Sequence, residues 1–424
     1  MPFKLPDTKI NLTNSAFLSS IALASVTVVP YHIWTHGIDL FQAGLFFVFF
    51  IATGLSITLG YHRLFAHKAF KASWPVRMVT LLFGAATFEN CVLAWTSDHR
   101  RHHKHVDHDE DPYDISQGFW YAHIGWILFR KASPPPWDNV MDLKKDKLVM
   151  IQSKYYLLIA LSMSFALPAA IGWWWAGPSG ALTAFLVAGV LRVLAVQQMT
   201  FFINSLCHTI GNRPYSSNCS ARDSWFMAIF TFGEGYHNYH HEFQHDYRNG
   251  VKWWQWDPTK WSIWTLSKLG MVSDLRRVKE EKIVASQLNE ARRLVKKTLA
   301  DTSLQLEEKR EELIRAAEVR LDELAERWGE LKEHYMSRAE ALRSSAAEIT
   351  EEKIEDARHE LVVGAEVEAK IINVDRKTRV INLSVKAKDV SEEKAAVKAH
   401  RQQETETTAA PTTIGDLIKA QMDK

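Results

Sequence analysis

The sequence has little cysteine for its length. Its 424 residues include three cysteines, Cys91, Cys207 and Cys219, and no two of them form a Cys-x-x-Cys pair. An odd number of widely spaced cysteines encodes neither a disulfide framework nor a rubredoxin-like iron site. The sequence therefore favours a reducing compartment.

The chain also lacks an excess of charge of one sign, because 51 Lys and Arg face 49 Asp and Glu, for a net charge of +2. Binding to nucleic acid through a large basic face needs more positive charge, so nucleic acid is not an expected partner. The charge is unevenly distributed: 40 of the first 274 residues are charged, against 60 of the last 150. Since 15 of the 18 histidines precede Asp274, the chemistry is expected in the first region.

Long apolar runs are present in that first region. A membrane-spanning helix needs roughly 20 mostly apolar residues. Four segments meet this requirement: 16–35, 40–59, 155–176 and 181–203. We therefore predict an all-α integral membrane protein with four transmembrane helices and a cytoplasmic, histidine-rich helical cap.

The orientation follows from the basic residues. The short connectors at 37–39 and 177–180 carry no Lys or Arg, whereas the long segment between the second and third spans carries many. By the positive-inside rule, that segment and both termini are cytoplasmic. The apolar stretch 76–95 contains Arg77, Glu89 and Asn90, so we expect one amphipathic helix lying on the membrane, with 120–129 as a second interfacial piece. Two further spans are the alternative.

One charge lies inside a predicted span. Arg192 is about eleven residues into the fourth apolar segment, where a guanidinium needs a partner or a polar cavity. Two interpretations stay open: pairing with a backbone carbonyl or polar side chain, or contact with a substrate.

Histidines form the most informative pattern. The sequence His-x-x-His-His occurs twice, at 99–103 and 237–241, and places three imidazoles on one face of a helix. Random placement of 18 histidines would give roughly 0.03 such triplets. His62 and His67 flank a third cluster, and Asn204 and His208 share a helical spacing in a fourth. Nine imidazoles exceed the ligand shell of one ion, so two redox-active metals are indicated.

Other patterns compete with this interpretation. Glu234-x-x-His237 and Glu242-x-x-His245 match the di-iron carboxylate motif of ferritin-like bundles, but both lie within twelve residues and glycines interrupt them. Glu234 could instead orient a ligating histidine. Further histidines are expected to be interfacial, solvated or hydrogen-bonded rather than ligands: His32, His36, His123, His105, His108 and His245.

These boxes resemble those of the integral-membrane acyl-CoA Δ9 fatty-acid desaturases of the stearoyl-CoA type, over about residues 30–270. The resemblance implies two iron ions, O2 as co-substrate, and insertion of a cis double bond into a long-chain saturated acyl-CoA. Asn204 matches a residue that reaches one iron through water. The implied metal ligands are His62, His67, His99, His102, His103, His208, His237, His240 and His241.

The resemblance also suggests partners. Arg130 and Lys131 match the region that meets the coenzyme A phosphates, although anchoring at the membrane surface would explain them equally well. The chain has no His-Pro dipeptide and hence no fused cytochrome b5 haem motif. Electrons are therefore expected from a separate ferredoxin, rubredoxin or cytochrome b5-type donor.

The tail after the desaturase-like region 1–274 divides into three predicted parts. Residues 275–360 form a charged helical or coiled-coil segment, since Leu321, Leu324 and Trp328 begin a heptad seam. Residues 361–390 alternate with period two and resemble the last two strands of the ribosomal S-one-type OB repeat, without its preceding strands. Residues 391–424 are expected to be disordered. We expect the tail to be a soluble appendage that the chemistry does not require.

Two other classes of function remain to be separated from the desaturase. A membrane di-iron hydroxylase of an alkane, sterol or lipid would use the same histidine boxes. A metal transporter or an RNA-tethered membrane protein would not be an enzyme, but transporters place their ligands near the middle of the membrane. The histidine clusters here lie beyond the predicted span ends, which disfavours that class.

Overall fold

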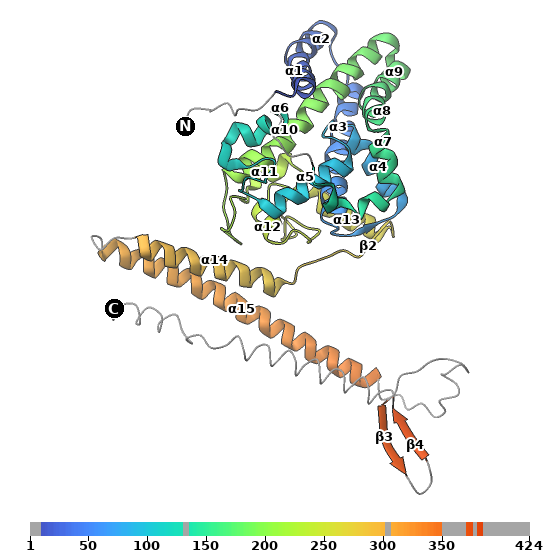
Figure 1. Ribbon diagram of the computed structural model, residues 1–424. Coiled ribbons are helices and arrows are strands. Elements are labelled where there is room, and N and C mark those ends of the chain that lie inside the picture. The colour runs from blue at the N-terminus through green and yellow to red at the C-terminus, as the bar shows by residue number, and fades with distance from the viewer. Residues whose placement is uncertain (1–9, 130–134, 302–306, 350–369, 376–379, 385–424) are drawn as a thin grey trace. The chain divides into compact units, whose positions relative to one another are not determined.

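A computed structural model describes residues 10–129, 135–301, 307–349, 370–375 and 380–384. The chain divides into two compact units, which are residues 1–337 and residues 338–424. The first is almost entirely helical (Figure 1), which confirms the predicted helical class.

Three helical stretches of the described residues are long and apolar enough to cross a membrane. The first runs from Leu12 to His36 and comprises α1 (Leu12–Val26) and α2 (Val28–His36). The second runs from Leu40 to Ala66 and comprises α3 (Leu40–Leu55) and the π-helical segment η1 (Ser56–Ala66). Asp39 caps α3, since its carboxylate accepts a hydrogen bond from the Gln42 N–H at 2.8 Å.

The third stretch extends from Tyr156 to His208 and includes both remaining predicted spans. Its helical geometry is interrupted at Ala176 and Gly177. Gly177 adopts a φ of 63°, a conformation that favours glycine. An added Cβ on Gly172 would lie 2.3 Å from the carbonyl oxygen of Gly180. Residues eight apart in one helix are about 12 Å apart along its axis, so the chain reverses direction here. Its elements are α8 (Tyr156–Leu161), η6 (Ser162–Ala166), α9 (Leu167–Ala184), η7 (Phe185–Leu191), α10 (Arg192–Ser205) and η8 (Leu206–His208).

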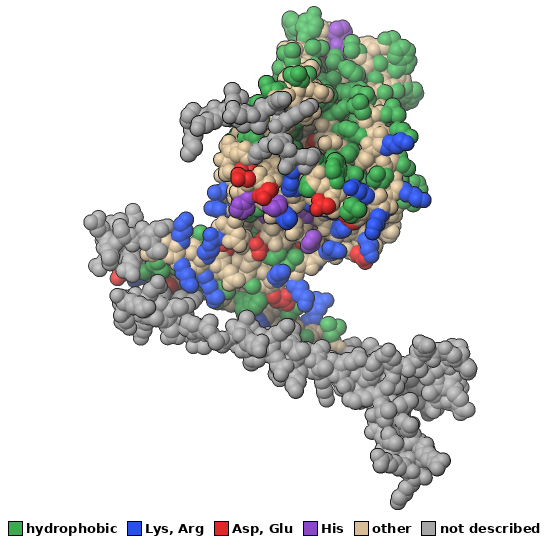
Figure 2. All heavy atoms as spheres, viewed as in Figure 1, with side chains coloured by type: hydrophobic (Ala, Val, Ile, Leu, Met, Phe, Trp, Pro, Cys, Tyr) green, Lys and Arg blue, Asp and Glu red, His purple; other side chains and the backbone are tan. Residues whose placement is uncertain are grey.

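Apolar side chains cover the outside of these long helices. Leu23, Trp34, Leu40, Phe47 and Trp174 are all exposed. Figure 2 shows hydrophobic side chains over the region of α1, α2 and α9, with Lys and Arg gathered away from it. A surface of this size and composition is typical of contact with lipid.

The stretch 76–95 differs from the expected single helix. It comprises α4 (Trp74–Ala85), a turn, and the beginning of α5 (Val92–His105). Arg192 binds the end of α4, since its Nη1 donates to the Ala86 carbonyl at 2.7 Å and its Nη2 to the Ser164 carbonyl at 3.4 Å. Its side chain is fully buried. Of the two interpretations of Arg192, pairing with backbone carbonyls is therefore confirmed.

Short elements lie between and after the long apolar stretches. A two-stranded antiparallel sheet pairs β1 (Lys71–Ala72), which follows η1, with β2 (Val272–Ser273) at the end of the desaturase-like region. Short helices η3 (Tyr121–Gly125) and α6 (Trp126–Leu128) occupy the stretch 120–129. The others are η2 (Ile115–Gln117), η4 (Trp137–Val140), η5 (Leu143–Lys145), α7 (Lys147–Lys154), α11 (Trp225–Phe230), α12 (His237–Glu242) and α13 (Pro258–Lys268).

The charged tail begins with two helices, α14 (Glu280–Asp301) and α15 (Glu307–Ile349). Arg327 Nη2 lies 3.9 Å from Glu280 Oε1, so α15 returns alongside α14 (Figure 1). In the second unit, β3 (Lys370–Asp375) and β4 (Val380–Ser384) pair in antiparallel fashion, which confirms the predicted hairpin. The predicted disordered part, residues 391–424, lies outside the described residues.

Candidate metal centre

Nine histidines from distant parts of the sequence come together in two neighbouring groups. Within each of two groups, the candidate ligand atoms lie within 4.8 Å of one another. Group A contains His62, His67, His99, His103 and His240. Group B contains His102, His208, His237 and His241. The two groups contain all nine histidines that the sequence singled out.

The π-helical geometry of η1 brings His62 and His67 together. The His67 N–H donates to the His62 carbonyl at 3.0 Å, an i→i+5 bond that closes one π turn. Residues five apart in an α-helix would point in clearly different directions, because each residue turns the helix by about 100°. Here the two ring centroids are 4.7 Å apart.

Each His-x-x-His-His motif contributes to both groups. On α5, His99 and His103 point into group A, and His102 belongs to group B. On α12 the assignment is reversed, because His237 and His241 belong to group B. Group A therefore combines the i, i+4 pair of α5 with one histidine of α12, and group B combines the i, i+4 pair of α12 with one histidine of α5. This interleaving couples the two groups, and the His103 and His241 rings stack at 4.4 Å.

The short helix α12 depends on a close backbone approach. An added Cβ on Gly235 would lie 2.1 Å from the Ala228 nitrogen, so only glycine fits between α11 and the start of α12. The Gly-Glu-Gly sequence before His237 thus allows this motif to pack close to α11. The ninth histidine, His208, is the last residue of η8, which directly follows α10.

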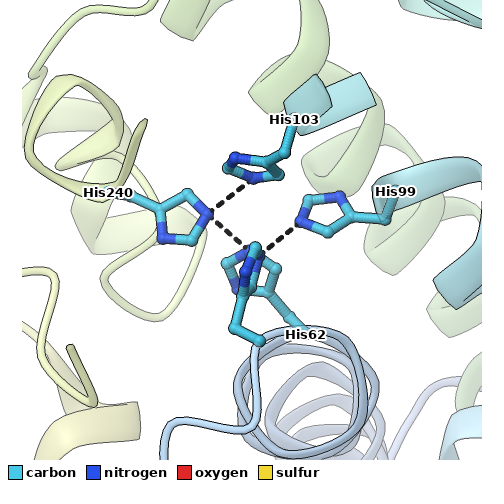
Figure 3. A group of neighbouring side chains, drawn as sticks. His62, His99, His103 and His240 are labelled. Carbon is cyan, nitrogen blue, oxygen red and sulfur yellow. Dashed lines mark hydrogen bonds between the residues drawn. The ribbon is translucent and has the colours of Figure 1, made fainter. Parts of the chain in front are cut away.

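The imidazole nitrogens converge on one another (Figure 3). In group A, His240 Nε2 lies 3.0 Å from His62 Nε2 and 2.9 Å from His103 Nε2. A further contact in group A joins His67 Nε2 and His99 Nε2 at 2.8 Å. In group B, His237 Nε2 lies 3.1 Å from both His208 Nε2 and His241 Nε2.

This arrangement fits metal coordination better than hydrogen bonding. A neutral imidazole nitrogen donates once or accepts once, so His240 Nε2 and His237 Nε2 cannot satisfy two neighbours each. In a shell with metal–nitrogen bonds of about 2.0–2.1 Å, adjacent nitrogens lie roughly 2.8–3.4 Å apart. The contacts quoted above agree with that spacing. Imidazole donors suit iron, copper, nickel and zinc.

A buried ionic network contacts group A on the Nδ1 side of His62. Glu234 Oε2 lies 2.9 Å from His62 Nδ1, and Glu234 Oε1 accepts from Arg63 Nη2 at 2.8 Å. Arg63 also lies 3.0 Å from Asp257, and Asn249 Nδ2 donates to Glu234 Oε2 at 2.7 Å. This close carboxylate contact on the Nδ1 side of His62 leaves its Nε2 facing the other group A nitrogens. The interpretation of Glu234 as a residue that orients a histidine is supported.

Group B has a different set of polar partners. His102 Nδ1 lies 2.9 Å from each carboxylate oxygen of Asp111. His208 Nδ1 lies 2.6 Å from Ser220 Oγ, and Asp107 Oδ2 accepts from the Ser220 N–H at 2.6 Å. These partners come from the loop after α5 and from the loop between His208 and α11.

The electrostatics favour neutral imidazoles beside ionised carboxylates. Burial and neighbouring imidazoles hold the pKa of His99, His103 and His240 well below the ordinary 6.5. Burial alone would raise the pKa of Glu234, but Arg63 and His62 outweigh it, so this pKa lies below 4.5. Metal binding needs unprotonated imidazoles, and this environment provides them.

A large pocket adjoins the histidines. Its volume is about 1220 Å³, and its lining includes His62, His99, His102, His237 and Asn204. Apolar side chains line other parts of it, including Phe17, Leu18, Ile57 and Trp95. Asn204 therefore borders the same cavity as members of both groups.

The other histidines that the sequence set aside lie outside both groups in the described part of the chain. His32 Nε2 lies 2.7 Å from Thr183 Oγ1, and His123 Nδ1 lies 3.0 Å from Ser205 Oγ. His245 Nδ1 lies 2.9 Å from the His67 carbonyl oxygen, and Glu242 is exposed. Neither Glu-x-x-His sequence supplies a carboxylate to these groups. Arg130 and Lys131 lie outside the described residues.

Sequence reasoning missed several residues that support the centre. Asp111 follows His102 by nine residues in an acidic run, which is the only sequence signal of its role. Asp107 and Ser220 meet only through folding. Asn238 stands between two ligand candidates in the third box, yet its amide binds the loop before α11, donating to the Ser216 carbonyl at 2.6 Å.

The fold and this site together indicate an integral membrane protein with two histidine groups that could hold metal ions. A family model, "Fatty acid desaturase", matches residues 40–268. The chain belongs to the fatty acid desaturase family. The histidine groups could bind a metal, and the family suggests iron.

Curated relatives carry consistent names. Acyl-CoA desaturase 1 of Saccharomyces cerevisiae is 41% identical over 260 residues, which cover 60% of this chain and 50% of the relative. The probable acyl-CoA desaturase of Schizosaccharomyces pombe is 41% identical, covering 56% of this chain and 49% of the relative. Human stearoyl-CoA desaturase is 34% identical, covering 65% and 76%. The chain thus spans about half the length of its two yeast relatives.

Proposed function

We propose that this protein is an acyl-CoA desaturase that inserts a cis double bond at the Δ9 position of a long-chain saturated acyl-CoA. The observation that carries this proposal is the pair of imidazole groups beside a largely apolar pocket of about 1220 Å³. The names of the relatives support the substrate class.

Each histidine group would hold one iron. His62, His67, His99, His103 and His240 would hold the first, and His102, His208, His237 and His241 the second. Asn204 would reach the second iron through water, since it precedes His208 by one helical turn and borders the pocket. When bound, the two irons supply the activation of O2 that removal of hydrogen from an unactivated chain requires.

The protein's own contribution is positioning. Glu234 and Asp111 fix the ring orientations of His62 and His102, so their Nε2 atoms face the groups' interiors. The apolar lining excludes water from the acyl chain and holds it beside the histidines. Arg101 and Lys104 also line the pocket, and Arg130 and Lys131 follow its lining residue Phe129. These cations suit the phosphates of coenzyme A.

The proposed topology has four spans. Support comes from the reversal at Gly177, because 53 helical residues would extend about 80 Å, far beyond one bilayer. Each half of that stretch can then cross once. The basic segment between the second and third spans favours a cytoplasmic centre and cytoplasmic termini. The electron donor would be a separate ferredoxin, rubredoxin or cytochrome b5-type protein.

The organisation of the tail is also a proposal. Residues 1–274 would form the desaturase domain, 275–360 a helical segment with coiled-coil character, 361–390 a partial OB-type hairpin and 391–424 a disordered end. The antiparallel return of α15 along α14 supports a helical hairpin in the first tail segment.

Lipid analysis tests the proposed function. Cells that express the full chain should accumulate monounsaturated acyl chains, with the double bond at C9 by mass spectrometry after derivatisation. A hydroxylated product without a new alkene would favour the membrane di-iron hydroxylase instead. A His240→Ala chain expressed at the same level serves as the control, and it should produce neither product.

A further inference from the structure

The tail helix α14 contacts the cap at the loop that carries Ser220. Ile283 joins a buried apolar cluster with Tyr215, Tyr239 and Phe243, and Tyr239 belongs to α12. Ser286 Oγ, one turn further along α14, donates to the Tyr215 carbonyl at 2.8 Å. One face of α14 therefore packs against both α12 and the loop before α11.

The next turn of α14 buries a carboxylate. Glu290 is only 5% exposed, and its Oε2 accepts from the Ser217 N–H at 3.1 Å. Its other oxygen accepts from the Ser217 hydroxyl, and Arg293 lies 3.6 Å away. Burying an ionised group is costly unless it is paired and hydrogen-bonded. These contacts indicate that Glu290 does more than contribute to a solvated face.

The loop bound by Glu290 leads directly to group B. Asn238 of α12 fixes its ends, because its amide binds the carbonyls of Ser216 and Ala221 at 2.6 and 3.0 Å. Between these ends, Glu290 binds Ser217, and Asp107 binds Ser220. Ser220 Oγ then lies 2.6 Å from His208 Nδ1. Ser220, whose hydroxyl contacts His208, follows the Glu290 partner Ser217 by three positions.

We propose that Glu290 is a positioning residue for the second metal. Through Ser217 it fixes the loop 215–221 and thereby the Ser220–His208 contact. This inference rests on the proposed function, since it takes group B as an iron site. It also changes the expected role of the tail, because α14 becomes part of the enzyme's working structure.

Iron content and iron retention test the proposal on the purified full chain in detergent. We expect the wild-type protein to hold two irons. Glu290→Ala should lose one of them to a mild chelator at about tenfold lower concentration, the lower end of the range for removing a partner of a metal ligand. Glu290→Gln keeps an acceptor for the Ser217 N–H and should restore most of the retention. The exposed Glu318→Ala on α15 is the matched control and should behave as wild type.

Two further variants separate positioning from folding. Ser217→Ala removes only the hydroxyl partner and should weaken retention of the same iron, even if Glu290→Ala fails to fold. In a chain with His208→Ala, Glu290→Ala should cause no additional loss, since both changes act on group B. Unchanged retention in Glu290→Ala and Ser217→Ala, with two irons in the wild type, would overturn the inference and leave the proposed function intact. A wild-type chain that binds no iron would contradict both.

Discussion

The two histidine groups differ in how the protein supports them. Group A is supported by a closed ionic network in the interior, in which Arg63, Glu234 and Asp257 are each at most 3% exposed in their side chains. Group B relies on the loops that carry Asp107, Asp111 and Ser220. Loops held by fewer buried contacts open more easily than core elements. If each group holds one iron, as proposed, the two irons should therefore differ in how easily they are lost.

The largest effect should come from removing a nitrogen of group A. His240→Ala is expected to reduce desaturation by at least about 1000-fold and to lower bound iron, because His240 contacts both His62 and His103. Product formation per purified chain and iron per chain are the measurements. Full activity in this variant would refute the role of His240 as a ligand.

Breaking the ionic network should affect both stability and group A. Glu234→Ala leaves Arg63 buried beside fewer anions, and breaking a buried pair costs about 3–5 kcal/mol. We expect a lower apparent Tm in detergent together with loss of iron. Arg320→Ala, which removes a largely exposed cation paired with the exposed Glu323, is the comparison variant and should change Tm little. Equal Tm values for the two variants would break the contrast between interior and peripheral support.

A smaller and more selective effect is expected at Asp111. Asp111→Asn keeps the side-chain volume but weakens the hold on His102 Nδ1, so affinity for the second iron should fall about 10–100-fold. Stepwise removal of iron by chelator should then show one iron leaving early and the other as in wild type. Loss of both irons together would show that the groups are not supported independently.

The smallest effect concerns Glu89. Glu234 is paired with the buried Arg63, whereas no ion pair joins Glu89 to a cation among the residues that the structure describes. Burial raises the pKa of Glu89 to about 8, although Thr200 and Trp95 oppose the rise. The folded chain thus retains a proton that the unfolded chain releases above about pH 4.5, and stability falls as pH rises from about 4.5 to 8. A glutamine side chain cannot ionise, so Glu89→Gln should raise Tm by about 5 °C at pH 8 and little at pH 4.5. A Tm difference independent of pH would contradict this.

The sequence predicted which residues form the centre better than how they are arranged. Recurrent His-x-x-His-His spacing is visible in one dimension, and all nine histidines meet as expected. Their division into groups was not predictable, because it depends on the π turn in η1 and on how α5 and α12 face each other. The break after α4 was also missed, since apolar composition continues through it and the turn is held by the distant Arg192.

The docking of α14 was missed for a related reason. Its inward face combines Ile283 with the polar residues Ser286 and Glu290, so its pattern is that of a solvated helix. Only the partners in the loop 215–221 reveal that this face is buried. The composition of the chain changes at Asp274, but α14, which follows this position, still contacts residues that precede it.

The i→i+5 turn between His62 and His67 makes the centre sensitive to chain length. A π turn corresponds to an α-helix with one inserted residue, and such insertions are frequent at functional sites. Inserting one residue after Leu64 would set His67 six positions after His62, and because each added residue turns a helix by about 100°, His67 would rotate away from group A. A single-codon insertion that leaves every histidine in the sequence would thus move a ligand candidate out of its group. Insertions in this segment should consequently be tolerated far less than substitutions of its apolar residues.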